Sequence, residues 1–513
     1  MATIDSIELA RLTVQGKLDS AKTQAERNRL GQFATPTDLA TDILSQARRM
    51  HTRGAPVRFL DPAFGTGSFY SALTRVFRPN EIERALGFEI DPAVVREARE
   101  IWRGSPLELK EIDFTQTLPP LDNAEKATLL ICNPPYVRHH HLPPEEKRRL
   151  QAITKLLGKV KLSGLSGLYC YFLCLSVAWM AKDGLAGWLI PSEFMDVNYG
   201  RPIKSFLLNR VTLLRVHRFD PEDVKFREAL VSSAIVWFRN TPPPQQQPPV
   251  EFSYGGTLTN PEFSRQVPAD VLREAAKWTQ FPLQREERNN EQRENKLSDL
   301  FTVKRGLATG ANDFFVLTPE QIAKHQIPAK FLTPILPGSR FLPADEIEAD
   351  EHGEPILERK LYLLTCNLPE QVVKEEYPTL WNYLRLGMAR GLHERYLCRS
   401  RSPWYAQENR PPAPIICTYM GRQNNGRGKP FRFILNHSKA TAANVYLMMY
   451  PTPALQAHLE HKPDILRRIW RELNQLSIKD LTSEGRVYGG GLYKLEPKEL
   501  GNVALRGSLL VNM

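Results

Sequence analysis

Four consecutive residues, Asn133, Pro134, Pro135 and Tyr136, combine groups that could grip a planar ligand. They follow an apolar run, residues 128–132 (TLLIC), which predicts a buried strand, and the two prolines cannot continue a sheet ladder. We therefore expect a stiff loop at the carboxyl end of a strand, where open α/β sheets bind their ligands. The Asn133 amide and the Pro134 carbonyl offer acceptor oxygens, and Tyr136 offers an aromatic face. Together they suit a flat ring that carries an exocyclic amino group.

Three acidic residues precede this loop, and each lies near the end of a predicted strand. They are Asp61, Glu89 and Asp113. An acid at the second strand end, about 20–30 residues after a glycine-rich turn, can accept hydrogen bonds from ribose hydroxyls. Asp113 with its neighbour Phe114 can hold an adenine ring by its amino group and its face. These side chains and Asn133 follow successive strands, so the pattern predicts one shared nucleotide site.

A nucleotide-type βα unit is expected to position these residues. The predicted strand 57–60 leads into a turn with Gly65 and Gly67, where missing side chains let the backbone approach a ligand. Upstream, Thr35 can cap a helix that holds Pro36 in its first turn. Further strands are predicted at residues 84–91, 107–114, 128–132, 184–191, 211–219 and 230–238. The last two are joined by a short loop, which predicts antiparallel neighbours.

Composition favours a folded chain with an anionic partner. The 513 residues are 42% hydrophobic and carry 68 Lys and Arg against 57 Asp and Glu, a net charge of +11. The six cysteines are scattered without CxxC pairs, which suits a reducing cytoplasm, and no signal peptide is evident. The apolar stretch 169–181 is too short to cross a bilayer and predicts a buried helix, so no membrane partner is expected.

The changes of composition predict four regions. They are a helical arm (1–30), a catalytic domain (31–245), a connecting segment (246–296) and a C-terminal domain (297–513) rich in Arg, aromatic and amide residues. Arg commonly contacts guanine edges, and Asn or Gln contacts adenine edges. The DNA-contact candidates are Arg138, Lys304, Arg305, Thr309, Asn312, Arg401, Trp404 and Arg422. Adjacent histidines at 139–141 cannot easily converge on one ion, and we expect no metal site.

The motifs GQFATP, DPAFGTG, GFEID, DF and NPPYV occur in this order. The chain thereby resembles the gamma-class, Taq-type adenine-N6 DNA methyltransferases of restriction–modification systems, over residues 30–240 and less specifically in the C-terminal part, at KRGLATGANDFF. The resemblance implies an α/β fold: a Rossmann-like class I S-adenosylmethionine-dependent methyltransferase sheet, followed by a mixed α+β target-recognition domain. It also implies S-adenosyl-L-methionine as cofactor, double-stranded DNA as partner, a separately encoded restriction endonuclease, and a cytoplasmic monomer.

The resemblance assigns roles to residues that match its motifs. Asn133 to Tyr136 are the catalytic motif, and Tyr136 and Phe226 stack on the target base. Asp61 faces the methionine moiety of the cofactor, and Glu89 takes its ribose hydroxyls. The full cofactor-binding set is Thr35, Pro36, Asp61, Ala63, Gly65, Gly67, Glu89, Ile90, Asp113, Phe114 and Asn133.

The chemistry expected of this motif is a direct, in-line methyl transfer to an amino nitrogen of a flipped-out base. Cys132 should face the core, and no covalent nucleophile is needed. Two alternatives stay open. Cytosine-N4 DNA methyltransferases more often carry Ser in place of Asn133, and protein glutamine N5-methyltransferases use the same NPPY residues but usually lack a large C-terminal domain. The 30 residues before GQFATP are too few for a fused nuclease.

Overall fold

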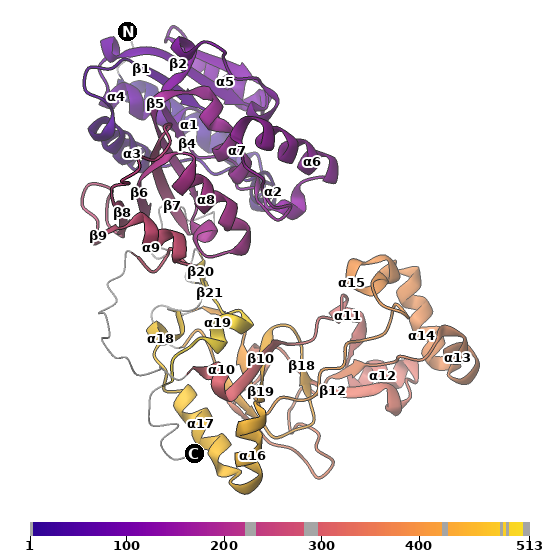
Figure 1. Cartoon of the computed structure of the whole chain (residues 1–513). Helices are drawn as coiled ribbons and strands as arrows, with labels where there is room; N and C mark the ends of the chain where they lie inside the picture. The colour runs from indigo at the N-terminus through magenta and orange to yellow at the C-terminus, as the bar shows by residue number, and fades with distance from the viewer. Residues whose placement is uncertain are drawn as a thin grey trace. The chain divides into compact units, whose positions relative to one another are not determined.

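The protein is described from a computed structural model, which covers residues 4–220, 232–281, 296–422, 429–482, 486–488 and 492–505. The chain forms two compact units (Figure 1). The first comprises Met1–Arg288 with Tyr488–Gly490, and the second comprises Asn289–Val487 with Gly491–Met513. Within the described residues, no helix is both long and apolar enough to cross a membrane.

A nine-stranded sheet forms the centre of the first unit, in the order β3-β2-β1-β4-β5-β7-β6-β8-β9. Its strands are β1 (Val57–Asp61), β2 (Ile82–Glu89), β3 (Leu107–Glu111), β4 (Ala127–Cys132), β5 (Met180–Pro191), β6 (Thr212–Arg218), β7 (Ser233–Arg239), β8 (Val250–Tyr254) and β9 (Phe263–Val267). The strands from β3 to β5 are parallel, so their carboxyl ends share one edge. β6 and β7 pair antiparallel, which confirms the expectation for the two strands joined by a short loop.

The sheet departs from expectation at three places. β3 ends at Glu111, so Asp113 and Phe114 lie in the turn after the strand and not within it. The predicted buried helix ends at Ser176, earlier than its apolar sequence suggests. β5 therefore begins at Met180 and not at residue 184. Residues 246–296, expected as a connecting segment, supply β8, β9 and a short helix to this unit.

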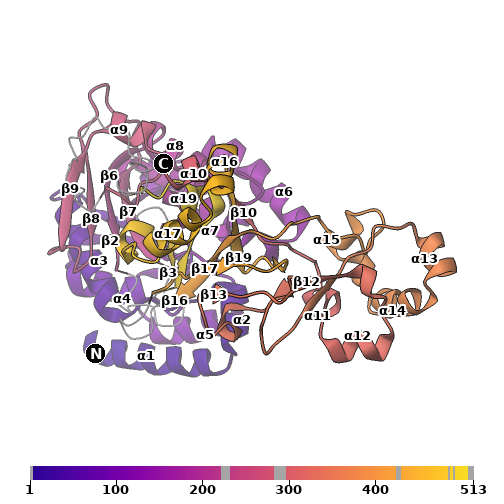
Figure 2. The same ribbon diagram turned by 90° about the horizontal axis from the view of Figure 1, so that it is seen from below.

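Helices cover both faces of the sheet. They are α1 (Ile4–Ser20), α2 (Gln24–Leu30), α3 (Thr37–Met50), α4 (Ser68–Val76), α5 (Pro92–Ile101), α6 (Pro144–Ile153), α7 (Leu168–Ser176), α8 (Arg201–Asn209) and α9 (Ala269–Glu274). Strand alternation separates two cores. Phe59 and Leu129 pack in the core with α3 and α4, whereas Leu60 and Leu130 pack in the core with α7 and α8. α1 runs beside α4 and α5 (Figure 2).

Two predicted helices occur with the expected buried faces. In α3 the side chains of Leu39, Ile43, Leu44 and Ala47 are at most 3% exposed. α7 is buried along its length, as its apolar sequence predicted. One detail of α3 was wrong: its N-cap is Pro36, which makes no side-chain cap bond, and Thr35 lies outside the helix. The Thr35 hydroxyl instead contacts the Asn133 amide.

The second unit is a mixed α+β structure with sheets in the orders β10-β19-β15-β17-β13, β11-β14-β12-β18 and β16-β21-β20. Its strands are β10 (Phe301–Arg305), β11 (Val316–Leu317), β12 (Leu332–Leu336), β13 (Glu346–Ile347), β14 (Tyr362–Leu364), β15 (Ile415–Thr418), β16 (Met420–Arg422), β17 (Phe433–Asn436), β18 (Thr441–Ala442), β19 (Tyr446–Pro451), β20 (Arg486–Tyr488) and β21 (Leu492–Lys494). Its helices are α10 (Leu297–Leu300), α11 (Asn312–Phe315), α12 (Pro319–His325), α13 (Glu370–Glu376), α14 (Pro378–Ala389), α15 (Tyr396–Arg399), α16 (Pro453–His461), α17 (Asp464–Leu473), α18 (Ile478–Thr482) and α19 (Pro497–Gly501).

Candidate functional site

A cavity of about 680 Å³ lies in the first unit, at the carboxyl ends of β1, β2 and β4. Its volume falls within the roughly 300–1,000 Å³ of small-molecule sites. Several sequence-predicted residues line it: Ala63, Gly65, Glu89, Ile90, Asp113, Phe114, Asn133 and Pro135. The topology therefore brings the predicted strand-end residues to one cavity.

The Glu89 carboxylate is hydrogen-bonded to the backbone of the glycine turn. One of its carboxylate oxygens accepts the N–H of Gly65 over 2.9 Å, and the other accepts those of Ile90 and Asp91, each over 2.9 Å. Burial raises the pKa of Glu89, while these three backbone N–H groups act in the opposite direction. The carboxylate is thus fixed in position at the cavity wall.

The two glycines of the turn are needed for different reasons. Gly65 has φ +58° and lines the cavity, so its backbone conformation favours glycine and leaves the wall open. Gly67 has φ +90° and precedes α4; a Cβ there would lie 2.6 Å from the Trp102 indole nitrogen. Only Gly65 meets the cavity, and Gly67 lets the turn pack against α5.

Asp61 lies beneath the turn and is not among the described residues that line the cavity. The expectation that Asp61 faces the methionine moiety stays a prediction. Its side chain is 1% exposed and accepts the Ala63 N–H over 3.1 Å, next to the buried thiol of Cys132. Burial, reinforced by the charge of Glu89, raises the pKa of Asp61 to about 7. Cys132 is fully buried, as predicted, and burial raises the pKa of its thiol.

Asp113 and Phe114 form another part of the wall. The Asp113 carboxylate accepts the Thr115 N–H over 2.8 Å, which fixes the turn after β3. Phe114 is 2% exposed, and its ring centroid lies 5.4 Å from that of Phe88 and 5.5 Å from that of Phe172. Asp113 can thus present a hydrogen-bond acceptor, and Phe114 an apolar face, to one flat ring.

Asn133 has a defined orientation with one unused acceptor. Its Nδ2 donates to the backbone carbonyl of Phe33 over 3.0 Å and to the Thr35 hydroxyl over 3.1 Å. A backbone carbonyl only accepts, so the amide nitrogen must lie on this side. The Asn133 Oδ1 is buried, lacks a hydrogen-bond partner among the described residues, and belongs to a side chain that lines the cavity.

Tyr136 anchors the loop to the sheet. It is 7% exposed, its hydroxyl donates to the Leu189 carbonyl over 3.1 Å, and its N–H donates to the Gly31 carbonyl over 3.2 Å. Its ring centroid lies 6.0 Å from that of Phe33. Pro134 is buried, and Phe226, the predicted second stacking residue, lies outside the described residues.

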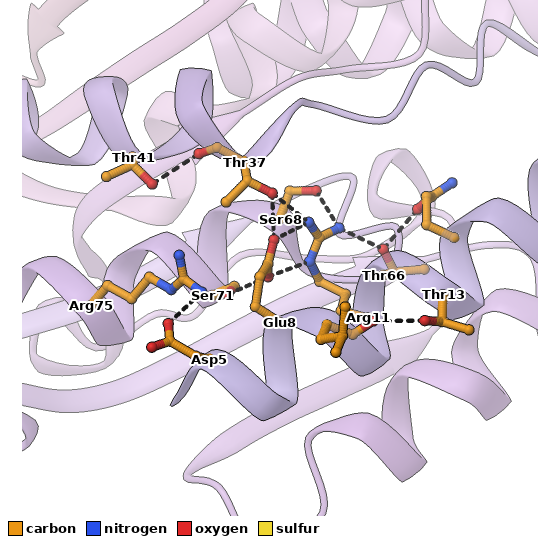
Figure 3. Close-up of polar contacts among 12 residues, drawn as sticks. Asp5, Glu8, Arg11, Thr13, Thr37, Thr41, Thr66, Ser68, Ser71 and Arg75 are labelled. Carbon is orange, nitrogen blue, oxygen red and sulfur yellow. Dashed lines mark hydrogen bonds and ion pairs between the residues drawn. The ribbon is translucent and has the colours of Figure 1, made fainter. Parts of the chain in front are cut away.

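A buried ion pair within α1, between Glu8 and Arg11, is hydrogen-bonded to the glycine turn and the start of α4 (Figure 3). The Arg11 guanidinium donates to the Glu8 carboxylate over 2.6 Å and to the hydroxyls of Ser68 and Thr66 over 2.9 and 3.2 Å. Glu8 also accepts the Ser71 hydroxyl over 2.6 Å. Although burial opposes it, hydrogen bonding by Arg11, Ser71 and Thr37 lowers the pKa of Glu8 to about 2.

The same helix supplies cavity residues that the sequence analysis missed. Gln15, Leu18 and Asp19 of α1 line the cavity, as does Lys22 just after the helix, and the Thr66 hydroxyl donates to Gln15 over 2.7 Å. Polar residues at helical spacing carried the signal, since Glu8, Arg11 and Gln15 lie on one face. An ordinary amphipathic helix would bury its leucines and expose its polar residues. In α1, however, Leu9 and Leu12 are 67% and 45% exposed, so the usual interpretation of the sequence misses the buried polar face. Other missed lining residues are Gln32, Phe33, His140, His141, Leu168 and Phe172.

The predicted DNA-contact residues are not equally accessible. Arg138, Lys304, Arg305, Asn312 and Arg422 are exposed. Thr309 is fully buried, and its hydroxyl donates to the Asn312 side chain over 2.5 Å. Arg401 donates to the carbonyls of Ala308 and Thr309, over 2.6 and 2.8 Å. Trp404 packs against Phe314 and Phe315. Thr309, Arg401 and Trp404 therefore hold a loop of the second unit together.

Two protein-family models match the chain. Residues 5–225 match the Eco57I restriction-modification methylase family, and residues 275–511 match the C-terminal domain of Type II methyltransferase M.Eco57I. Type II methyltransferase M.XamI of Xanthomonas campestris pv. amaranthicola is 28% identical over 92% of this chain and 84% of its own length. Type II methyltransferase M.AccI of Acinetobacter calcoaceticus is 25% identical over 92% of this chain and 85% of its own length.

A solved structure with a similar fold is that of the Type IIL restriction-modification enzyme MmeI in complex with DNA. The superposition has a TM-score of 0.51 and 13% identity and covers 93% of this chain and 64% of that one. At this identity the likeness concerns the fold alone, and it supports the predicted methyltransferase architecture.

Proposed function

Because this chain belongs to the Type II restriction–modification methyltransferase family, we propose that it methylates the N6 amino group of adenine in double-stranded DNA. The cofactor is S-adenosyl-L-methionine, which supplies an electrophilic methyl group on a sulfonium when bound. The proposed role is to protect host DNA from a separately encoded restriction endonuclease, with the protein acting as a monomer.

The donor groups of the cavity fit such a cofactor. Glu89 can accept from ribose hydroxyls at the end of β2, where its carboxylate is already fixed by backbone N–H groups. Asp113 offers an acceptor and Phe114 an apolar face for the adenine ring. The glycine turn at Gly65 keeps the wall open between them. Glu89, Asp113 and Phe114 are accordingly proposed to hold the nucleoside part.

One observation favours an amino group as the methyl acceptor. The Asn133 Oδ1 is buried without a partner among the described residues, whereas the Nδ2 of the same amide is held by Phe33 and Thr35. A buried acceptor without a hydrogen bond costs about 1–3 kcal/mol. An incoming N–H donor would satisfy it, and the exocyclic amino group of adenine is such a donor.

The chemistry follows from the low nucleophilicity of that amino group, whose lone pair is delocalised into the ring. If Asn133 Oδ1 and the Pro134 carbonyl each accept one N–H, the nitrogen is drawn toward sp³ character and its lone pair is freed. When bound, the cofactor would supply its sulfonium methyl group: the N–C bond would form as the methyl–sulfur bond breaks, S-adenosylhomocysteine would be the leaving group, and the surplus proton would pass from the nitrogen to water. Positioning and fixed dipoles supply the catalysis, without a covalent step on the buried Cys132.

A base inside a duplex cannot reach a buried acceptor, so the target adenine must be flipped out at a cost of a few kcal/mol. Stacking on an aromatic side chain recovers about 1–3 kcal/mol per contact. Tyr136 is proposed for this role, held by its bonds to Leu189 and Gly31. Phe226 is proposed as a second stacking residue.

The experiment that tests this function identifies the methylated atom. The protein is incubated with unmethylated plasmid DNA and tritium-labelled S-adenosylmethionine, and the DNA is then digested to nucleosides and separated by chromatography. We expect the label in N6-methyldeoxyadenosine. Label in N4-methyldeoxycytidine, or in protein glutamine, would establish one of the two alternatives instead.

A further inference from the structure

The second unit contains a cavity of about 830 Å³, to which strands of three of its sheets contribute lining residues. Its walls come from the end of β10, the turn after β12, the loop before β14, the segment between β15 and β16, and the residues after β18. We call it the arginine groove, after three arginines among its lining residues: Arg305, Arg340 and Arg359. All three are exposed.

The three guanidinium groups rest on aromatic rings and not on carboxylates. Arg305 lies 4.1 Å above the ring centroid of Tyr419. Arg340 and Arg359 lie 4.6 and 4.1 Å from the centroid of Phe341. None of the three forms an ion pair with a carboxylate in the part of the chain that the structure describes. Stacking restricts the motion of a guanidinium without using its N–H edge, and of the Arg305 nitrogens the Nε already donates to the Asn444 carbonyl over 3.3 Å.

The charge of the groove is positive. The carboxylate among its described lining residues is that of Asp313, and it is already paired with Arg390. Three arginines without carboxylate partners on one concave surface would repel one another, and an anionic ligand relieves this repulsion. Planar donor forks in such a place favour phosphates or the acceptor edges of bases.

Exposed apolar side chains lie in the same groove. Phe341, Met420 and Val445 are 39%, 42% and 48% exposed and all line it. Clustered exposed apolar side chains commonly mark a binding surface. A surface that met only phosphates would need cations alone, whereas apolar contacts suit thymine methyl groups and base edges. Asn312 and Asn444 add amide side chains to the lining, which suit adenine edges.

We propose that the arginine groove contacts base edges of the DNA duplex and determines sequence specificity, with Arg305, Arg340 and Arg359 as its principal donors. This inference rests on the proposed function, and it assigns the sequence-reading step to residues outside the methyl-transfer cavity. Of the sequence-predicted candidates, Arg305 and Asn312 lie in the groove.

The test measures DNA binding without methyl transfer. The wild-type full-length chain first selects a preferred duplex from a randomised pool, and fluorescence anisotropy then measures Kd for this duplex and for a scrambled one. Arg305→Ala, Arg340→Ala and Arg359→Ala should each weaken binding to the selected duplex about tenfold or more. Binding to the scrambled duplex should change by about twofold or less, so that discrimination falls.

The matched control is Arg467→Ala. Arg467 is a half-buried arginine of the same unit on α17, paired with Glu346 and outside the groove. Its loss should leave both Kd values within about twofold. If Arg359→Ala fails to fold, Arg359→Lys keeps the charge but loses the planar fork, and it should lose discrimination as well.

Two results would overturn the inference. One is wild-type discrimination in all three alanine variants. The other is an equal loss on both duplexes with a reduced salt dependence, which identifies phosphate contacts only. Since selection and anisotropy need no methylation, a failure here is distinguishable from a failure of the proposed adenine chemistry, which the nucleoside analysis reports separately.

Discussion

The Nδ2 of Asn133 donates a hydrogen bond to the hydroxyl of Thr35 over 3.1 Å, although 98 residues separate the two in the chain. A second bond from the same nitrogen to the Phe33 carbonyl fixes the amide plane. The amide oxygen, which has no hydrogen-bond partner among the described residues, is thereby left as the acceptor. The segment before α3 thus orients the side chain on which the proposed transfer depends.

Removing the Thr35 hydroxyl should slow methyl transfer without weakening cofactor binding. In Thr35→Val the Asn133 amide loses one of its two acceptors, and a hydrogen bond of this kind contributes about 1 kcal/mol. We expect the single-turnover rate to fall about fivefold, with little change in the Kd of S-adenosylmethionine. Thr35→Ser should restore the rate; equally slow Ser and Val variants would contradict this role of the hydroxyl.

Gly31 should tolerate substitution far less than a glycine of similar backbone conformation. Gly31 has φ +66°, and a Cβ there would lie 2.4 Å from the backbone nitrogen of Tyr136. Gly54 has φ +79°, and a Cβ there would meet nothing within 4 Å. Alanine should cost about 1–2 kcal/mol at both positions through backbone strain, and clearly more at Gly31.

Thermal unfolding and methylation assays of Gly31→Ala and Gly54→Ala compare the two positions. The Gly31 variant should be the less stable and should lose most of its activity, because the two loops can no longer approach. Equal stability and activity of the two variants would show that this approach does not matter.

Breaking the buried ion pair should loosen the cofactor site. Arg11→Ala leaves the carboxylate of Glu8 buried with fewer partners, which costs about 3–5 kcal/mol for pairs of this kind. It also removes the bonds to Thr66 and Ser68 beside the glycine turn. We expect a lower melting temperature and a KM for S-adenosylmethionine raised about tenfold, with a smaller change in kcat.

The control for Arg11 is Arg75→Ala on α4, which removes a pair between the half-buried Arg75 and the exposed Asp5 of α1 and should change both quantities much less. The double variant Glu8→Met with Arg11→Met leaves no orphaned charge and should be more stable than Arg11→Ala. A double variant that is less stable would contradict the assigned origin of the cost.

Asp61 should make stability and cofactor affinity depend on pH. Burial raises its pKa in the folded protein to about 7, from 3.8 for an exposed aspartate. Because the pKa of Asp61 is higher in the folded than in the unfolded protein, its contribution to stability is fully present below the unfolded pKa and is lost as pH rises through about 7. Asp61→Asn should lack this component in melting temperatures measured from about pH 5.5 to about pH 8.

The cofactor should counteract this loss. Its sulfonium and ammonium groups give it a net positive charge, which favours the ionised carboxylate beneath the turn. Binding should therefore release a proton near pH 7, and affinity should increase with pH. Calorimetry of the wild type in buffers of different ionisation enthalpy measures this release, and an unchanged release in Asp61→Asn would assign it to another group.

The strands that carry the site were predictable because each combines a short apolar run with a following turn signal. β1, β2 and β4 end within a residue or two of the predicted positions, and Glu89, Asp113 and Asn133 reach one cavity. The orientation of Asp61 was not predictable in the same way. It depends on which side of β1 its last side chain points to, and that side holds Cys132.

Other features depend on contacts between distant segments. The sequence of α1 suggests an ordinary amphipathic arm, yet its polar residues Glu8 and Arg11 are buried and Leu9 is exposed. In the second unit, Arg340 and Arg359 belong to separate segments of the chain, and both stack on the ring of Phe341. No local sequence pattern predicts that two distant arginine side chains stack on one ring, so the arginine groove could be identified only from the structure.

The proposed methyl transfer depends most on Asn133. The most direct measurement is the single-turnover rate of methyl transfer by Asn133→Ala at saturating S-adenosylmethionine and DNA, with cofactor affinity measured in parallel. Loss of a preorganised hydrogen-bond acceptor should slow transfer by about 100- to 1,000-fold, while the Kd of the cofactor stays within about threefold of the wild type. A rate within about tenfold of the wild type would contradict the proposed role of the Asn133 oxygen.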